Sequence, residues 1–359
     1  MIINSQKRSF GRGAKVSLFT LGTMRATESL EKMYSIIKNA YYVGINHIET
    51  APSYGDAESL IGNSIKKLEI EENIKEKNWV ITSKVLPKGD FDFLKNNFKK
   101  SLKNLNREKI NNLAIHGLNL KQHLDWVIAG EGKKFISWIL EKELVDQVGF
   151  SSHGSYSLIK EAINCEVFSF CSLHLHYLDQ SKIALAEEAI KKGMGVLAIS
   201  PADKGGRLYS PSDILLEASK PFHPLELAYR FLLAKGITTL SLGATNKKDF
   251  EFAHKLRNSF EKLTKLEKSA LNKIEEVANE RLNSTKCEQC RCCLPCPNEI
   301  PIPEILRLRN ISIGYGQLEF SKERYNLIGK AGHWWEEINS SSCEECNKCV
   351  PKCPSKLDI

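Results

Sequence analysis

Short apolar runs alternate with amphipathic stretches eight times in the first 258 residues, and this alternation constrains the fold more than any other feature. Strands that alternate with helices pair in parallel, and eight such units close into a (β/α)₈ TIM barrel. An open doubly wound sheet is the rival, but no GxGxxG follows the first run. The apolar runs are 16–22, 45–50, 79–85, 111–116, 147–151, 168–175, 195–200 and 238–243. The stretches with helical spacing are 30–42, 56–68, 91–105, 133–142, 155–163, 181–192, 224–235 and 247–258.

The composition changes near residue 284. A polar helix is expected at 261–283, and the sequence KCEQC then begins a cysteine-rich part. Residues 303–340 have helical patterning without a convincing strand pair. We therefore predict two domains, a barrel at 1–284 and a smaller α-helical module at 285–359.

Nine of the eleven cysteines lie between residues 287 and 353. Nothing near the N-terminus resembles a secretory signal, so a disulfide framework is a poor explanation. The order is C-x₂-C-x₂-C-x₂-C-P in the first group and C-x₂-C-x₂-C-x₃-C-P in the second, the pattern of proteins that bind two [4Fe–4S] clusters. The groups comprise Cys287, Cys290, Cys293 and Cys296, then Cys343, Cys346, Cys349 and Cys353.

In two-cluster ferredoxins the fourth cysteine of each group binds the other cluster. The motif thus predicts a ferredoxin-like module in which Cys353 completes the first cluster and Cys296 completes the second. Two zinc sites are the alternative. A zinc site of this kind uses two CxxC pairs, however, and does not need a third cysteine at the same two-residue spacing. Cys292 could replace Cys293 as a ligand or stand beside the cluster as a free thiol.

The net charge of +8 lies on residues 1–284, because the part from 285 onward holds ten basic and ten acidic residues. A solvated surface explains this excess, and attraction of an anionic cofactor or an acidic partner is the alternative. No basic block interleaved with aromatic residues indicates nucleic acid. No apolar run approaches the roughly 18 residues that a membrane span needs. We expect a cytoplasmic location and no membrane partner.

Polar residues stand at the ends of three consecutive predicted strands, in GINHIETAPSYGDAESLIG, WVITSKV and LAIHGLN. This arrangement resembles the aldo-keto reductase superfamily over most of residues 10–258. With the cysteine motifs, the whole chain resembles the ferredoxin-fused subgroup. The resemblance implies an NAD(P)H-dependent oxidoreductase that reduces an aldehyde or ketone.

The resemblance also implies a catalytic set. Tyr54 takes the place of the general acid, Lys84 that of the cation beside it, and His116 that of the group that orients the carbonyl. A nearby ammonium group would lower the pKa of the tyrosine, which is near 10 when free. Glu49 stands where the family pattern has Asp. Its extra methylene could still reach Lys84 or could displace it by about an ångström, which costs on the order of 10²-fold in rate.

Further positions resemble the family's nucleotide-binding segments. Ser151 and Ser152 in GFSSHGS correspond to the segment that binds the carboxamide, and Ser172 on the sixth strand occupies a position where the family often has Gln or Asn. The ISPADKGGRL segment resembles the pyrophosphate loop, and LGATNKKDF resembles the phosphate-binding loop. A phosphate there could accept N–H bonds, and Lys247 or Lys248 could pair with a 2′-phosphate, which would favour NADP(H) over NAD(H). The loop residues concerned are Ser200, Lys204, Gly205, Gly243, Ala244, Thr245 and Lys248.

The two predicted parts use different electron chemistry. Nicotinamide transfers two electrons as hydride, whereas a [4Fe–4S] cluster normally transfers one, so a flavin is a further possible cofactor. The clusters could be structural, or they could deliver electrons to a redox protein partner. An electron-transfer or binding module with a degenerate barrel is the alternative function, because Glu49 departs from the pattern.

Overall fold

A computed structural model describes residues 5–202, 206–259 and 261–359. The contacts divide the chain into two compact units. The first unit comprises residues 1–175, 182–201 and 232–261, and the second comprises 176–181, 202–231 and 262–359. The boundary near 284 rests on composition and stays a prediction.

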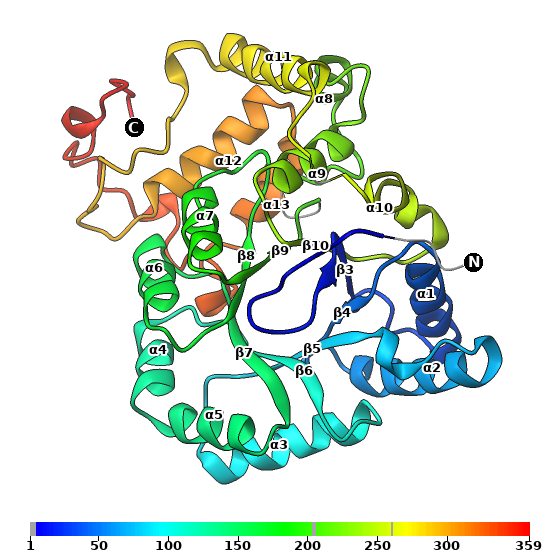
Figure 1. The fold of residues 1–359 in the computed structure, drawn as a ribbon. Coiled ribbons are helices and arrows are strands. Elements are labelled where there is room, and N and C mark those ends of the chain that lie inside the picture. Colours follow the sequence, from blue (N-terminus) through cyan, green and yellow to red (C-terminus); the bar gives the residue numbers. More distant parts are fainter. Residues whose placement is uncertain (1–4, 203–205, 260) are drawn as a thin grey trace. The chain divides into compact units, whose positions relative to one another are not determined.

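Eight parallel strands close a barrel in the first unit, in the order β10-β3-β4-β5-β6-β7-β8-β9 (Figure 1). Because β10 pairs with both β3 and β9, the sheet has no open edge. The predicted (β/α)₈ barrel is confirmed, and the open sheet is excluded. The strands are β3 (Phe19–Gly22), β4 (His47–Glu49), β5 (Val80–Val85), β6 (Ile110–Ile115), β7 (Val145–Ser152), β8 (Phe170–His174), β9 (Gly195–Ile199) and β10 (Thr239–Leu242).

Helices of the first unit lie outside the strands (Figure 1). Several begin at a side-chain cap: Ser29, Asp90 and Ser155 each accept a bond from the backbone N–H three residues later. The predicted helix at 247–258 forms as a 3₁₀ turn followed by a short α-helix, and α4 was not predicted. The elements are α1 (Leu30–Tyr42), α2 (Ala57–Glu72), η1 (Glu76–Asn78), α3 (Phe91–Asn104), α4 (Lys121–Ile128), α5 (Glu131–Glu141), α6 (Tyr156–Asn164), α7 (Ile183–Lys191), η2 (Lys247–Phe250) and α10 (Glu251–Leu256).

A short hairpin closes the N-terminal end of the barrel. Strands β1 (Lys7–Arg8) and β2 (Val16–Ser17) pair antiparallel, so the predicted strand at 16–22 is divided and only β3 enters the barrel. Phe10, between β1 and β2, is fully buried, and its ring centroid lies 4.9 Å from that of Phe170. The hairpin therefore supplies apolar core to the barrel interior.

A set of buried, hydrogen-bonded polar side chains, here called the polar belt, crosses the barrel interior next to this hairpin. The Thr20 hydroxyl bonds the Thr239 hydroxyl and His47 Nδ1, each at 2.7 Å. His47 Nε2 bonds Thr82 Oγ1 at 2.7 Å, and Asn112 Nδ2 donates to the same oxygen at 3.0 Å. Gln147 extends the belt by donating to Asn112 Oδ1 and to Phe10 O, both at 2.8 Å. Buried polar groups of this kind stabilise a fold only when each finds a partner.

The second unit is built from helices and 3₁₀ turns. Helix α9 (Pro224–Ala234) contributes residues to both units. In the second unit Arg230 donates to the Glu267 carboxylate through Nε at 2.5 Å and through Nη2 at 3.1 Å. Glu267 also forms a capping box with Thr264 at the start of α11. The other elements are α8 (Asp213–Ala218), α11 (Lys265–Leu282), η3 (Asn283–Thr285), α12 (Ile302–Gly314), α13 (Leu318–Tyr325), η4 (Gly332–Trp334), η5 (Ser340–Ser342) and η6 (Val350–Lys352).

Candidate active site

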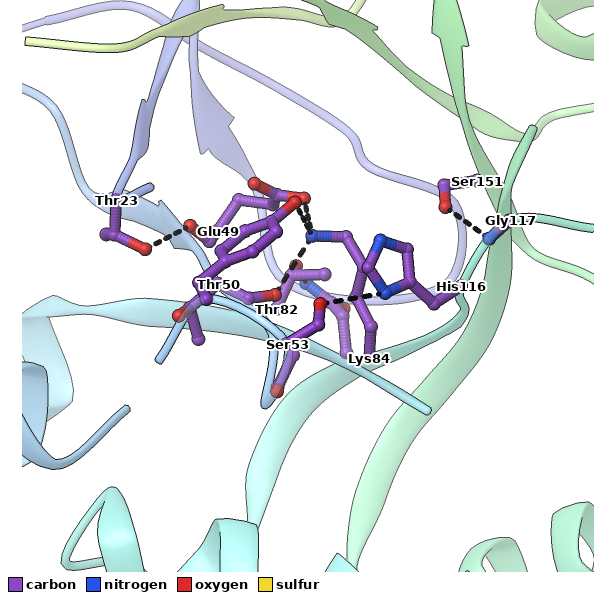
Figure 2. A network of polar contacts seen from close by, with 12 residues as sticks. Thr23, Glu49, Thr50, Ser53, Thr82, Lys84, His116, Gly117 and Ser151 are labelled. Atoms are coloured by element: carbon purple, nitrogen blue, oxygen red, sulfur yellow. Dashed lines mark hydrogen bonds and ion pairs between the residues drawn. The ribbon is translucent and has the colours of Figure 1, made fainter. Parts of the chain in front are cut away.

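Glu49, Lys84 and His116 lie together at the C-terminal ends of strands β4, β5 and β6 (Figure 2). Tyr54 joins them, because its hydroxyl is bonded by Lys84 and its ring lies beside that of His116. Glu49 is the last residue of β4, Lys84 lies near the end of β5, and His116 follows β6 directly. Tyr54 lies in the turn between β4 and α2, where Gly55 has a left-handed φ of 61° and lets the chain turn into the helix. This end of a (β/α)₈ barrel is where such folds place catalytic groups.

Lys84 joins the other polar groups of this set. Its ammonium group forms an ion pair with the Glu49 carboxylate, and both side chains are almost fully buried. The same nitrogen donates to Tyr54 Oη at 2.9 Å and to Thr50 O at 3.0 Å. The longer side chain of Glu49 therefore reaches Lys84, and the lysine in turn contacts the tyrosine hydroxyl.

The electrostatics of Tyr54 differ from the expectation. Burial raises the pKa of Tyr54, and the Glu49 carboxylate raises it further, whereas Lys84 lowers it. The net direction is upward, so the predicted lowering by Lys84 is outweighed in this structure. Burial alone would lower the pKa of Lys84, but Glu49 and Tyr54 raise it above the ordinary value. The site thus holds a charged lysine next to a protonated phenol.

His116 stands beside the tyrosine as a neutral imidazole. Burial, reinforced by the Lys84 charge, lowers its pKa to about 3. Its ring lies edge-on to Tyr54 with centroids 6.0 Å apart, and its Nδ1 is 3.4 Å from Ser53 Oγ. A neutral imidazole N–H can donate to a substrate oxygen without adding a second positive charge beside Lys84.

The three serines predicted at the cofactor site have different environments. Ser151 Oγ accepts a bond from Gly117 N at 3.0 Å. Ser152 Oγ donates to Leu118 O at 2.6 Å and accepts from Gly154 N at 3.0 Å. Both of these hydrogen bonds of Ser152 therefore go to backbone atoms of the loops that follow β6 and β7. Ser172 pairs in register with Ser151, and its buried hydroxyl has no hydrogen-bond partner among the described residues. An orphaned hydroxyl beside Ser151 fits a polar ligand group such as a carboxamide.

The predicted phosphate loop follows β10. Gly243 and Ala244 directly follow the strand, but the N–H of Thr245 donates to the carboxylate of Asp249 at 2.7 Å. A phosphate would have to compete with this internal anion for that donor. Lys248 lies in η2, and Ser200 follows β9 with a left-handed φ of 50°. Lys204 and Gly205 lie outside the described residues.

The sequence interpretation missed Arg25. It follows β3, the neighbour of β10 in the closed barrel, and its Cδ lies 3.4 Å from the position that a Cβ on Gly243 would take. A cation at this point stands next to the candidate phosphate loop. A basic residue directly after the first barrel strand is the signal that could have found it, since closure brings the first and last strands together.

Comparisons with known proteins give independent evidence on the family. A sequence model of the Aldo/keto reductase family matches residues 19–286, well over half of the chain. The chain belongs to the aldo/keto reductase family. This reductase is therefore an NAD(P)H-dependent oxidoreductase with the barrel fold of its family.

Two curated relatives match part of the reductase. It is 29% identical over 216 residues to an aldose reductase of Encephalitozoon cuniculi. The aligned region covers 56% of this chain and 69% of that protein. It is 25% identical over 214 residues to an aldo-keto reductase of Strobilurus tenacellus, which covers 57% of this chain and 61% of that protein. The match to the second relative thus spans less than two thirds of its length.

Solved structures show the same fold. An aldo-keto reductase of Bacillus halodurans in its holo form has a TM-score of 0.64 at 19% identity, over 75% of this chain and 96% of that chain. An aldo-keto reductase of Bombyx mori in complex with NADP has a TM-score of 0.58 at 18% identity, over 75% and 92% of the two chains. At these identities the likeness concerns the fold alone.

Four of the predicted cluster thiols line one cavity in the second unit. Pro303, Leu306 and Leu357 also line this cavity. Burial raises the pKa of Cys287, and the nearby thiols of Cys290 and Cys353 add to the effect. The four thiols are those of Cys287, Cys290, Cys293 and Cys353.

The other four thiols also form a group. Burial raises the pKa of Cys349, and its thiol neighbours add to the effect; these are Cys346, Cys296 and Cys343. Cys292 is exposed, and it is absent from the lining of the first cavity. In the described parts of the chain, no three acidic, histidine or cysteine side chains stand close enough to hold a single metal ion. A cubane differs from a single ion, because its four thiolates bind four separate irons.

Proposed function

We propose that the barrel reduces an aldehyde or ketone with Tyr54 as the proton donor, and that Lys84, Glu49 and His116 assist it. The observation that carries the proposal is the single ammonium group that contacts both the Glu49 carboxylate and the Tyr54 hydroxyl. NAD(P)H, when bound, would supply a hydride to the carbonyl carbon. Tyr54 would donate its proton to the developing negative oxygen, and the neutral imidazole of His116 would donate a hydrogen bond to it.

The protonation states support this assignment. A phenol with a raised pKa holds its proton at neutral pH, so the acid is present before the reaction. When the proton leaves, the adjacent Lys84 stabilises the phenolate at short range in a buried site. Glu49 keeps Lys84 charged and in place. These contacts favour an active reductase over the alternative of a degenerate barrel that only binds or transfers electrons.

We also propose where the cofactor binds. Ser151 and the orphaned hydroxyl of Ser172 would hold the carboxamide, and Ser152 would support them through its loop contacts. Gly243, Ala244, Thr245, Lys248 and Ser200 would face the phosphates. Lys204 and Gly205 are proposed from the family resemblance alone, because they lie outside the described residues. Lys248 favours NADP(H), because a 2′-phosphate carries extra negative charge.

Replacement of Tyr54 by Phe tests the reductase. Loss of a positioned general acid costs about 10²–10⁴-fold in rate, so Y54F should lose carbonyl reduction and keep NADPH binding measured by fluorescence. Tyr156 is an exposed tyrosine on α6 of the same unit, and Y156F is the matched control that should retain both. Unchanged turnover in Y54F would remove Tyr54 as the acid.

For the second unit we propose two [4Fe–4S] clusters with crossed ligands. Support comes from the cavity that is lined by three thiols of the first motif and one of the second. The chemistry of the donor set fits, since thiolates bind iron–sulfur clusters and zinc alike, but four thiols around a cavity suit a cage better than a single ion. One cluster would use Cys287, Cys290, Cys293 and Cys353, and the other would use Cys343, Cys346, Cys349 and Cys296.

Iron and sulfide analysis after anaerobic purification tests the clusters. We expect about eight irons and eight sulfides per chain, four for each cubane. Cys353→Ser should reduce iron by about half, whereas Cys292→Ser should keep all of it, because Cys292 does not line the cavity. Stoichiometric zinc with no sulfide would overturn the proposal. A flavin would appear as a released chromophore in the same preparation.

A further inference from the structure

The two cysteine motifs fold the backbone in the same way. Left-handed φ angles recur at matched positions after the first, second and fourth cysteine of each motif. Non-glycine residues rarely adopt this conformation, so its repetition at matched positions indicates that both motifs wrap their thiols in the same way. The matched pairs are Gln289 (57°) with Glu345 (51°), Arg291 (63°) with Asn347 (56°), and Glu299 (55°) with Lys356 (52°).

The paired loops differ in one side chain that contacts sulfur. Gln289 Nε2 donates to Cys287 Sγ at 3.3 Å and to Pro303 O at 2.9 Å. An amide NH₂ has two hydrogens, so both bonds can exist together. At the matched position stands Glu345, an exposed residue whose side chain lacks the amide NH₂ of Gln289. The Glu345 loop contacts Cys343 Sγ through the backbone N–H, at 3.4 Å.

The position of Cys287 relative to this amide is fixed by helix α12. Asn310, a buried residue of α12, accepts a bond from Cys287 N at 3.3 Å and donates to Cys287 O at 2.8 Å. Pro303, which receives the second Gln289 bond, lies in the first turn of the same helix. The sulfur and its donor are therefore both tied to α12.

We propose that Gln289 is a positioning residue that raises the reduction potential of the cluster held by Cys287, Cys290, Cys293 and Cys353. The proposal rests on the clusters proposed above. Reduction adds negative charge that is shared by the ligand sulfurs, and a hydrogen bond to a sulfur stabilises the reduced form more than the oxidised form. Removal of the donor should therefore lower the potential of this cluster and leave the other unchanged.

The experiment is a potentiometric titration of the full chain under anaerobic conditions, followed by electron paramagnetic resonance. Gln289→Met keeps the length of the side chain and removes the donor, so one of the two midpoint potentials should fall. Gln289→Glu keeps the shape and adds a negative charge, so the same potential should fall further. Glu345→Gln is the matched control in the other loop, and it should leave the Gln289-sensitive potential unchanged. Iron and sulfide contents should equal those of the unmodified chain.

Each outcome has a distinct meaning. Unchanged potentials in both Gln289 variants with full iron content would overturn the role of Gln289 and leave the clusters intact. Loss of iron in both variants would also overturn it, because Gln289 would then retain the cluster instead of adjusting it. If the unmodified chain contains no iron and sulfide, the proposal of the clusters is itself wrong, and the role of Gln289 is wrong with it.

Discussion

Glu49 is the residue at which this chain departs from its family pattern. The carboxylate still contacts Lys84, so the extra methylene is absorbed without loss of the ion pair. A buried ion pair lowers the free energy of unfolding little while both partners are present. Removal of one partner leaves an uncompensated buried charge and lowers the free energy of unfolding by about 3–5 kcal/mol. The pair is therefore a stability element as well as a proposed catalytic one.

Glu49→Gln should reduce kcat strongly, because Lys84 would lose the group that keeps it charged. It should also lower the free energy of unfolding by about 3 kcal/mol. Glu49→Asp restores the charge on a shorter side chain and should recover most of the stability. Steady-state kinetics and urea unfolding measure the two effects separately. A fully active E49Q enzyme would contradict the proposed role of the pair.

His47 should make the fold sensitive to acid. Burial lowers its pKa from 6.5 to about 3. The unfolded chain therefore binds a proton at this residue before the folded chain does, so the stability is fully present above pH 6.5 and is lost as the pH falls toward 3. The slope approaches about 1.4 kcal/mol per pH unit for each such histidine.

His47→Gln should make the unfolding free energy less dependent on pH in urea titrations between about pH 5 and pH 7. His116 adds a second slope of the same sign, because its pKa is also lowered to about 3. The matched control replaces an exposed histidine on α10 in the same way, His254→Gln. An equal slope in H47Q and the unmodified chain would exclude His47 as the acid-sensitive group.

At the scale of elements, the packing of α2 on the end of α3 depends on one glycine. A Cβ on Gly62 would lie 2.6 Å from Asn104 O and from Leu105 C, and both are backbone atoms. Gly62→Ala should therefore destabilise the chain by about 1–3 kcal/mol in spite of the better helix propensity of Ala. Denaturant unfolding measures this change, and Gly193→Ala is unsuitable as a control because Gly193 has a φ of 79°. Lys66→Ala, at an exposed position of α2, serves instead.

Elements whose apolar residues recur at a regular spacing could be predicted from the sequence, and elements without such a spacing could not. The eight barrel strands follow from their apolar runs. The hairpin of β1 and β2 has two residues in each strand and therefore no alternation to detect. The polar belt was hidden because His47, Thr82 and Asn112 lie within runs that read as apolar core. Which face of a strand points inward becomes visible only when the barrel closes.

The sequence predicted which residues come together in the candidate site, but not the direction in which the pKa of Tyr54 is shifted. The order of Glu49, Tyr54, Lys84 and His116 along consecutive strands placed them at one end of the fold. The direction of the Tyr54 pKa could not be obtained from residue types, because it depends on how far burial outweighs a neighbouring charge. Arg25 was missed since its neighbour Gly243 is more than 200 residues away along the chain.

At the scale of the whole molecule, the two proposed chemistries belong to different compact units. The side chains of the proposed catalytic set lie in the first unit and the clustered thiols lie in the second. No helix in the described ranges combines the length and the apolar character that a membrane crossing needs. Hydride transfer to a carbonyl requires no one-electron carrier, so the barrel can act without the clusters.

Removal of iron with a chelator should therefore leave carbonyl reduction by NADPH within a few-fold of the untreated rate. The visible absorbance of the clusters should disappear in the same sample. Addition of NADPH to the untreated protein should not bleach that absorbance unless a flavoprotein is added. Loss of reductase activity with the iron would show instead that the clusters take part in the reaction or hold the barrel's cofactor.

The polar belt inside the barrel has an evolutionary consequence. Each member satisfies its neighbours, so one aliphatic substitution would strand at least one buried donor or acceptor at a penalty of about 1–3 kcal/mol. Simultaneous exchange of Thr20, His47, Thr82, Asn112 and Thr239 for aliphatic residues would strand none of these side chains, whereas Gln147 also bonds the backbone at Phe10 O and Arg12 N. Diverging descendants of this sequence should keep those five side chains together or abandon them as a block, and a survey that finds them varying independently would refute this expectation.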